Sequence, residues 1–84
     1  MNKYTLENKP NFQFGEEVLV DFGFMYMYLD AAPVKGKIVG KSSEHILDVW
    51  LIQFDRDSLV KAIPHFHSPY NTFAIQHTLI INNK

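Results

Sequence analysis

In Val34-Lys-Gly-Lys-Ile-Val39 the two lysines alternate with Val34, Gly36 and Ile38. A period of two places successive side chains on opposite faces of an extended chain, so this stretch predicts a β-strand whose lysines face water. Asp48-Val-Trp-Leu-Ile-Gln-Phe54 has the same period, with Trp50 on the more apolar face. Before both, Glu17–Phe22 predicts another strand. The three segments together favour a mainly β protein.

Two shorter segments extend this pattern toward the C-terminus. Thr72–Ile75 and Leu79–Ile81 predict short strands on either side of a tight turn at 76–78. Five short strands separated by turn residues favour a small barrel, because closure removes the exposed edges of a sheet. Its expected core consists of Val18, Val20, Ile38, Trp50, Ile52 and Phe54.

Three phrases of the sequence resemble the SH3-like barrels of the Tudor, KOW and PWWP kind. They are Gly15-Glu-Glu-Val18, Gly36-Lys-Ile-Val-Gly40 and Trp50-Leu-Ile-Gln-Phe-Asp55, on three successive expected strands. The resemblance covers about residues 14–82. It is a spacing pattern of a fold that hosts many unrelated functions, so it indicates architecture more than activity.

The resemblance implies a strongly bent five-stranded barrel with a binding groove between two loops. Mapped onto this chain, those loops are residues 23–33 and 56–71. We therefore expect a single SH3-like barrel domain over residues 12–82, preceded by a polar N-terminal leader over residues 1–11 that is loose.

The connection after the third expected strand is longer than in a plain SH3-like barrel. Its start, Ser58–Ile63, predicts one helical turn that Asp57 or Ser58 caps and Pro64 ends. The whole insertion, 58–70, has enough apolar side chains to pack on the domain. Connections of this length in compact domains tend to be functional.

Val18–Leu29 concentrates more apolar and aromatic surface than a domain of 84 residues easily buries. Tyrosine and methionine are enriched in the centres of protein interfaces. We therefore expect a protein partner to contact the first long loop and the insertion. The expected partner-binding residues are Phe24, Met25, Tyr26, Met27, Tyr28, Asp30, Phe66 and Tyr70.

Several other interpretations of the aromatic run stay open. Its residues can be core, or can pair with a second copy of the chain in a homodimer. The family resemblance also implies an aromatic cage for a methylated lysine, for which Tyr26, Tyr28, Tyr70 and Asp30 are the candidates.

A nucleic-acid-binding barrel is the main alternative function. Cationic side chains near aromatic rings are typical of a phosphate track beside a stacking platform. Interleaved acids and a pI of about 6.4 argue against it, since nucleic-acid-binding proteins usually carry a clear basic excess. The residues that would serve this function are Lys35, Lys37, Lys41, Arg56 and Lys61.

Catalysis and cofactor binding have little support in the sequence. His65, His67 and His77 could in principle bind zinc or copper, but no cysteine is present and no carboxylate completes the set. No serine lies in a nucleophile elbow, and no glycine-rich loop accompanies an acid–base pair. We expect a non-enzymatic protein without a cofactor or metal.

Composition places the chain among small globular proteins, with 46% hydrophobic and 20% charged residues. No signal peptide or membrane-spanning run is apparent, so we expect a cytoplasmic protein. In its size and isolation the chain resembles the accessory proteins of phages and mobile elements, which often modulate or inhibit a host complex. Such a protein would act in the host cytoplasm.

Overall fold

A computed structural model describes residues 2–21, 33–43, 46–63 and 68–82 of the chain. Its strands are β1 (Glu17–Val20), β2 (Val34–Ser43), β3 (Val49–Phe54) and β4 (Thr72–Gln76). One short helix, α2 (Arg56–Ala62), separates β3 from β4, and a 3-10 turn, η1 (His77–Leu79), follows β4. The mainly β prediction is confirmed. None of the helices in the described segments is long and apolar enough to span a bilayer.

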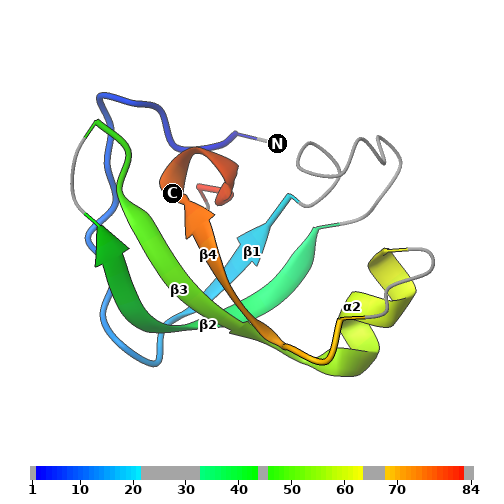
Figure 1. Cartoon of the computed structure of the whole chain (residues 1–84). Helices are drawn as coiled ribbons and strands as arrows, with labels where there is room; N and C mark the ends of the chain where they lie inside the picture. Colours follow the sequence, from blue (N-terminus) through cyan, green and yellow to red (C-terminus); the bar gives the residue numbers. More distant parts are fainter. Residues whose placement is uncertain (1, 22–32, 44–45, 64–67, 83–84) are drawn as a thin grey trace.

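The four strands form one open antiparallel sheet in the order β1-β2-β3-β4 (Figure 1). Val20 pairs with Val34 at the edge, and Ile52 pairs with Ile38 and Phe73 in the centre. Within the described residues no closed barrel is detected. The prediction of a mainly β fold therefore holds, whereas the sheet observed is open and has four strands instead of the five of the predicted barrel.

β2 continues four residues beyond the predicted end at 39, through a stretch that has turn composition. Its register against β3 shifts between Ile38 and Gly40 and again between Lys41 and Ser43. Each shift places an extra residue on β2, which bends a strand and increases its twist. Figure 1 shows the resulting curvature of β2 along the sheet. Gly40, Lys41 and the two serines that follow, which have the composition of a turn, therefore extend the strand.

All six predicted core residues are buried, and they lie in one cluster with side chains from α2, β4 and η1. Period-two alternation explains this result, because β1 and β3 turn every second side chain inward. Lys35 and Lys37 on β2 are exposed, as predicted. Lys41 is half-buried instead, because the register shift before it turns its side chain toward Trp50.

Gly36 lies where β2 approaches the side chains of β3. A Cβ atom at this position would overlap Ile52 Cγ2 and would lie 2.8 Å from Phe54 Cε1. Both neighbours are buried and have little room to move. We expect Gly36→Ala to destabilise the protein by about 1–3 kcal/mol, the usual cost of overpacking a core. Chemical denaturation measures it, and Gly40→Ala, where the nearest contact is 3.2 Å, should be milder.

α2 begins two residues earlier than the predicted helical turn, and Asp55 caps it rather than Asp57 or Ser58. The Asp55 carboxylate accepts hydrogen bonds from the Ser58 N–H at 3.3 Å and from the Ser58 hydroxyl at 3.2 Å. Ser58 thus occupies the third helical position and donates to the cap. At the other end Ile63 is extended, as expected for a residue that precedes a proline.

The end of the chain returns to β1 after η1. The Ile81 N–H donates to the Leu19 carbonyl at 2.8 Å, and the Asp21 N–H donates to the Leu79 carbonyl at 2.9 Å. Ile80 forms an isolated bridge with Val20. The predicted tight turn is therefore present one residue later, as η1, and isolated bridges stand in place of the predicted last strand.

Residues 2–5 lie beside residues 80–82, which differs from the expectation of a loose leader (Figure 1). The Tyr4 N–H donates to the Ile80 carbonyl at 3.2 Å, and the Asn82 N–H donates to the Asn2 carbonyl at 2.8 Å. Lys3 adds an ion pair with Asp21 at 2.7 Å. Backbone hydrogen bonds, which need no particular side chains, hold this polar segment on the domain.

Candidate functional site

Most of the predicted partner-binding residues lie outside the described residues. This applies to Phe24, Met25, Tyr26, Met27, Tyr28, Asp30 and Phe66. Tyr70 is described, and 69% of it is exposed. The choice between core, interface and aromatic cage for the aromatic run therefore stays a prediction.

The described part of the insertion is anchored on one side and exposed on the other. Leu59 and Ile63 are buried in the core, and α2 packs against β2. Val60, which lies on the flank of α2 next to this buried face, is 53% exposed. We call Val60 and Tyr70, the two large apolar side chains of the insertion that are exposed among the described residues, the insertion surface.

Both long connections begin and end near this insertion surface. Val20 and Val34 are paired, so the segment between β1 and β2 leaves and re-enters the sheet at one place. α2 lies at the same end of the sheet, next to the start of β2 (Figure 1). The topology thus brings the flanks of the two expected contact regions together.

Two of the five cationic candidates for nucleic-acid binding are paired with carboxylates. Lys35 pairs with Glu17 at 3.1 Å, and Lys41 pairs with Asp48 at 3.4 Å while its ammonium lies 4.8 Å from the centre of the Trp50 ring. Lys37 is exposed on β2, whereas Arg56 and Lys61 are exposed on α2.

His77 is a buried structural histidine in this fold. Its Nδ1 accepts a hydrogen bond from the Asp48 N–H at 3.1 Å, and its Nε2 lies 2.8 Å from the Thr5 carbonyl. An N–H can only donate, so Nδ1 is the acceptor and Nε2–H donates to Thr5. His65 and His67 lie outside the described residues, among which no group of three possible metal ligands occurs.

Asp48 is a second buried polar residue that the sequence did not single out. It is 6% exposed, and its carboxylate pairs with Lys41 and, at 3.5 Å, with Lys9 of the N-terminal segment. Its backbone carbonyl also accepts from the His77 N–H at 2.8 Å. Asp48 and His77 therefore join three separate parts of the chain at the start of β3. An aspartate before a strand carries no signal of such a role.

A row of aromatic rings runs from the N-terminal segment into the core. Tyr4 meets Phe12 edge to face at 5.8 Å between ring centres, and Phe12 meets Trp50 in the same way at 5.2 Å. Edge-to-face contacts of this kind add to the free energy of burial. Phe12 is buried, so it belongs to the core although it precedes the first strand.

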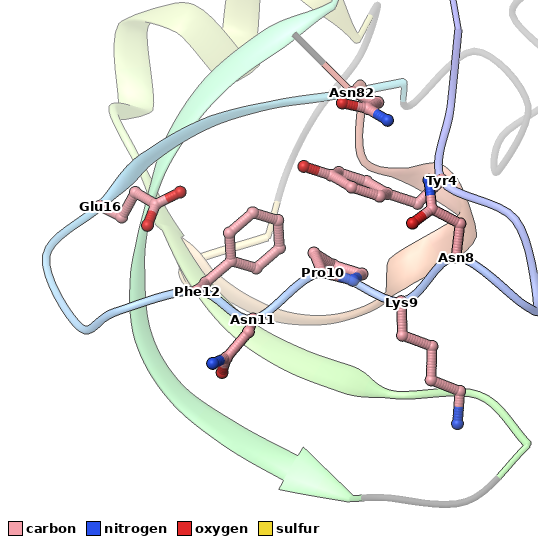
Figure 2. A pocket seen from close by; sticks show the side chains of 8 residues that line it. All are labelled: Tyr4, Asn8, Lys9, Pro10, Asn11, Phe12, Glu16 and Asn82. Carbon is pink, nitrogen blue, oxygen red and sulfur yellow. The ribbon is translucent and has the colours of Figure 1, made fainter. Parts of the chain in front are cut away.

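This row borders a pocket of about 280 Å³ that the sequence did not predict (Figure 2). Tyr4, Pro10 and Phe12 form its apolar wall, while Lys9, Glu16 and three asparagine side chains form its polar rim. Burial raises the pKa of the Tyr4 phenol above its ordinary value of 10.0, and the charge of Glu16 adds to the rise.

Comparison of the chain with protein-family models, with curated proteins and with solved structures gave no match. The chain is therefore described as a small mainly β protein with a four-stranded antiparallel sheet and one short helix, without an assigned family.

Proposed function

We propose that this protein is a non-enzymatic protein-binding module and that a partner contacts the insertion surface together with the 23–33 segment. The observation that carries the proposal is the exposure of Val60 on a helix that Leu59 and Ile63 fix to the core, with Tyr70 exposed further along the same connection. A fixed surface loses little conformational entropy on binding, which favours affinity. In a chain of this size, such binding suits a modulator or inhibitor of a larger complex.

An SH3-like barrel is the architecture we propose for this module. The support comes from the order of the strands, the strong bend of β2, and the 3-10 turn after β4. The bridge between Ile80 and Val20 further supports it, since it brings the chain back to the first strand as closure of such a barrel would require. In that arrangement the two long connections flank one groove.

The charges of the described residues favour a protein partner over nucleic acid. Non-specific affinity for nucleic acid comes from cations that neutralise phosphates. Lys35 and Lys41 are already paired with carboxylates, and the whole chain carries a net charge of −1. A basic face formed by Lys37 with α2 stays an alternative, with weaker support.

The proposal predicts that Val60→Ser combined with Tyr70→Ser abolishes partner capture without unfolding the protein. Both side chains are largely exposed, so the melting temperature should stay close to that of the parent. At an interface, truncating two such anchors typically weakens binding by about 2 kcal/mol or more each. Affinity capture with quantitative mass spectrometry, using parent and variant as bait, measures the difference.

Phe14→Ser combined with Ile46→Ser provides the matched control. These two side chains are each 73% exposed but lie before β1 and between β2 and β3, away from the insertion. Equal loss of captured proteins with both double variants would contradict the proposed surface. A complex with DNA that persists at about 150 mM salt and is lost in Lys37→Glu would favour the nucleic-acid alternative instead.

A further inference from the structure

We propose that the pocket between the N-terminal segment and Glu16 binds an organic cation, a guanidinium or alkylammonium group. The pocket involves none of the residues assigned to the insertion surface, so this inference goes beyond the proposed function. Its support comes from the charge of Glu16, the two rings beside it, and the position of the one lysine on its rim.

Glu16 is a carboxylate without a cationic partner among the described residues. Its Oε1 accepts from the Gln13 N–H at 3.3 Å, which leaves the charge uncompensated. The neighbouring acids differ in this respect. Glu17, Asp21 and Asp48 each form an ion pair with a lysine. Glu16 therefore gives the pocket a negative end.

Tyr4 and Phe12 supply the surface against which a cation would lie. Their rings are 5.8 Å apart and stand at 87° to each other. Figure 2 shows the Tyr4 hydroxyl pointing toward the side of the pocket where Glu16 lies, and in this view the Phe12 ring lies between the two side chains. An aromatic face attracts a cation electrostatically, and partial loss of water strengthens this attraction. The aromatic rings and the Glu16 carboxylate would therefore attract the same bound cation.

Lys9, the lysine on the rim of the pocket, is not itself the cation that pairs with Glu16. Its ammonium lies 3.5 Å from Asp48 Oδ1 at the start of β3. In Figure 2 its side chain extends away from the Tyr4 ring and from Glu16. The positive charge on the rim is therefore held at the far side, and the end of the pocket near Glu16 is open to a cation from outside.

The size of the pocket limits the ligand. Its volume of about 280 Å³ lies just below the usual range of roughly 300–1,000 Å³ for pockets that hold drug-sized ligands. A ligand the size of one arginine or lysine side chain, or of a small free amine, would match this volume. Polar amide groups on the rim can accept hydrogen bonds from the N–H groups of either.

The test is a titration of the ¹⁵N-labelled protein with N-acetyl-arginine amide, followed by amide chemical shifts. N-acetyl-citrulline amide, which has nearly the same shape without the charge, is the control ligand. We expect the arginine compound to shift the resonances of residues 4–16 with a dissociation constant of about 1 mM, as befits a ligand of this size. The citrulline compound should bind at least about fivefold more weakly. Equal binding of the two compounds, or no shifts in this segment, would overturn the proposal.

Two matched variants test the carboxylate. Glu16→Gln keeps the acceptor for the Gln13 N–H and removes only the charge, whereas Glu17→Gln makes the same change at the adjacent residue, which is paired with Lys35. We expect Glu16→Gln to weaken binding about fivefold and Glu17→Gln to leave it within about twofold. Equal weakening by both would show that net charge, rather than this pocket, attracts the ligand.

Agmatine and putrescine distinguish the two sources of such a cation. Tighter binding of these free amines than of the blocked arginine and lysine amides indicates a small metabolite. The opposite order indicates the side chain of a protein. Either order supports a cation site, and failure of all four compounds to bind rejects it. Val60→Ser with Tyr70→Ser should bind these ligands normally, so the outcome is independent of the insertion surface.

Discussion

We expect Trp50→Ala to be largely unfolded at room temperature. Trp50 is 3% exposed as the second residue of β3, where it pairs with Lys41 on one side and Ile75 on the other. Truncation removes its contacts with Phe12 and with the Lys41 ammonium as well. Loss of a buried tryptophan typically costs about 3–5 kcal/mol, which is comparable with the whole stability of a domain of this length. Circular dichroism and thermal melting measure the loss.

Trp50→Phe separates the packing of this side chain from its polar atom. The Nε1 atom of Trp50 is buried and has no hydrogen-bond partner among the described residues. Phenylalanine removes this unsatisfied group and keeps an aromatic ring, so the variant should stay folded with a loss of at most about 2 kcal/mol. Val39→Ala, at an exposed position of β2, should be close to neutral. Parent-like melting of Trp50→Ala would contradict the assignment of Trp50 to the core.

The strands and the core follow from the sequence because alternation is a local property. In β1 and β3 each inward position carries an apolar residue, so the period alone identifies the buried face. The extent of β2 does not follow in this way. Its register shifts depend on how β3 lies beside it, and Gly40 is compatible with both a turn and a bulged strand.

The start of α2 shows another limit of local reasoning. Asp55, Asp57 and Ser58 are all good capping residues, and the sequence alone does not rank them. The end of β3 determines which residue caps the helix, because it leaves Asp55 extended and able to accept a hydrogen bond from the Ser58 N–H. The prediction was wrong by two residues although the element itself was present.

The sequence does not predict the pocket, because much of its wall belongs to the N-terminal segment, for which the sequence predicts a loose polar leader. Residues 2–11 have no hydrophobic period. Besides side-chain contacts such as those of Lys3 and Tyr4, backbone hydrogen bonds to residues 80–82 hold them on the domain. Backbone hydrogen bonds do not depend on which side chains a segment carries, so the sequence does not reveal them. The aromatic residues Tyr4 and Phe12 were the available signal, since two rings in a polar stretch of this length are more than a solvated leader needs.

His77 joins the start of β3 to the N-terminal segment, and we expect His77→Ala to lower the free energy of unfolding by about 2–4 kcal/mol. The side chain is fully buried, so its removal leaves a cavity. It also leaves the Asp48 N–H and the Thr5 carbonyl without their present partners, and an unsatisfied buried group typically costs about 1–3 kcal/mol. Denaturant titration gives the loss in stability, with Thr78→Ala, at the half-buried adjacent position, as the control.

His77→Phe distinguishes hydrogen bonding from packing at this site. Phenylalanine fills a similar space but neither accepts from the Asp48 N–H nor donates to the Thr5 carbonyl, so we expect it to restore little of the stability. Hydrogen exchange should show faster opening at the amides of Tyr4 and Asn82, because the N-terminal segment loses its link to the start of β3. If His77→Phe is as stable as the parent with unchanged exchange, the ring acts by volume alone. The segment that forms the pocket would then be held by the backbone pairing of residues 2–4 with residues 80–82.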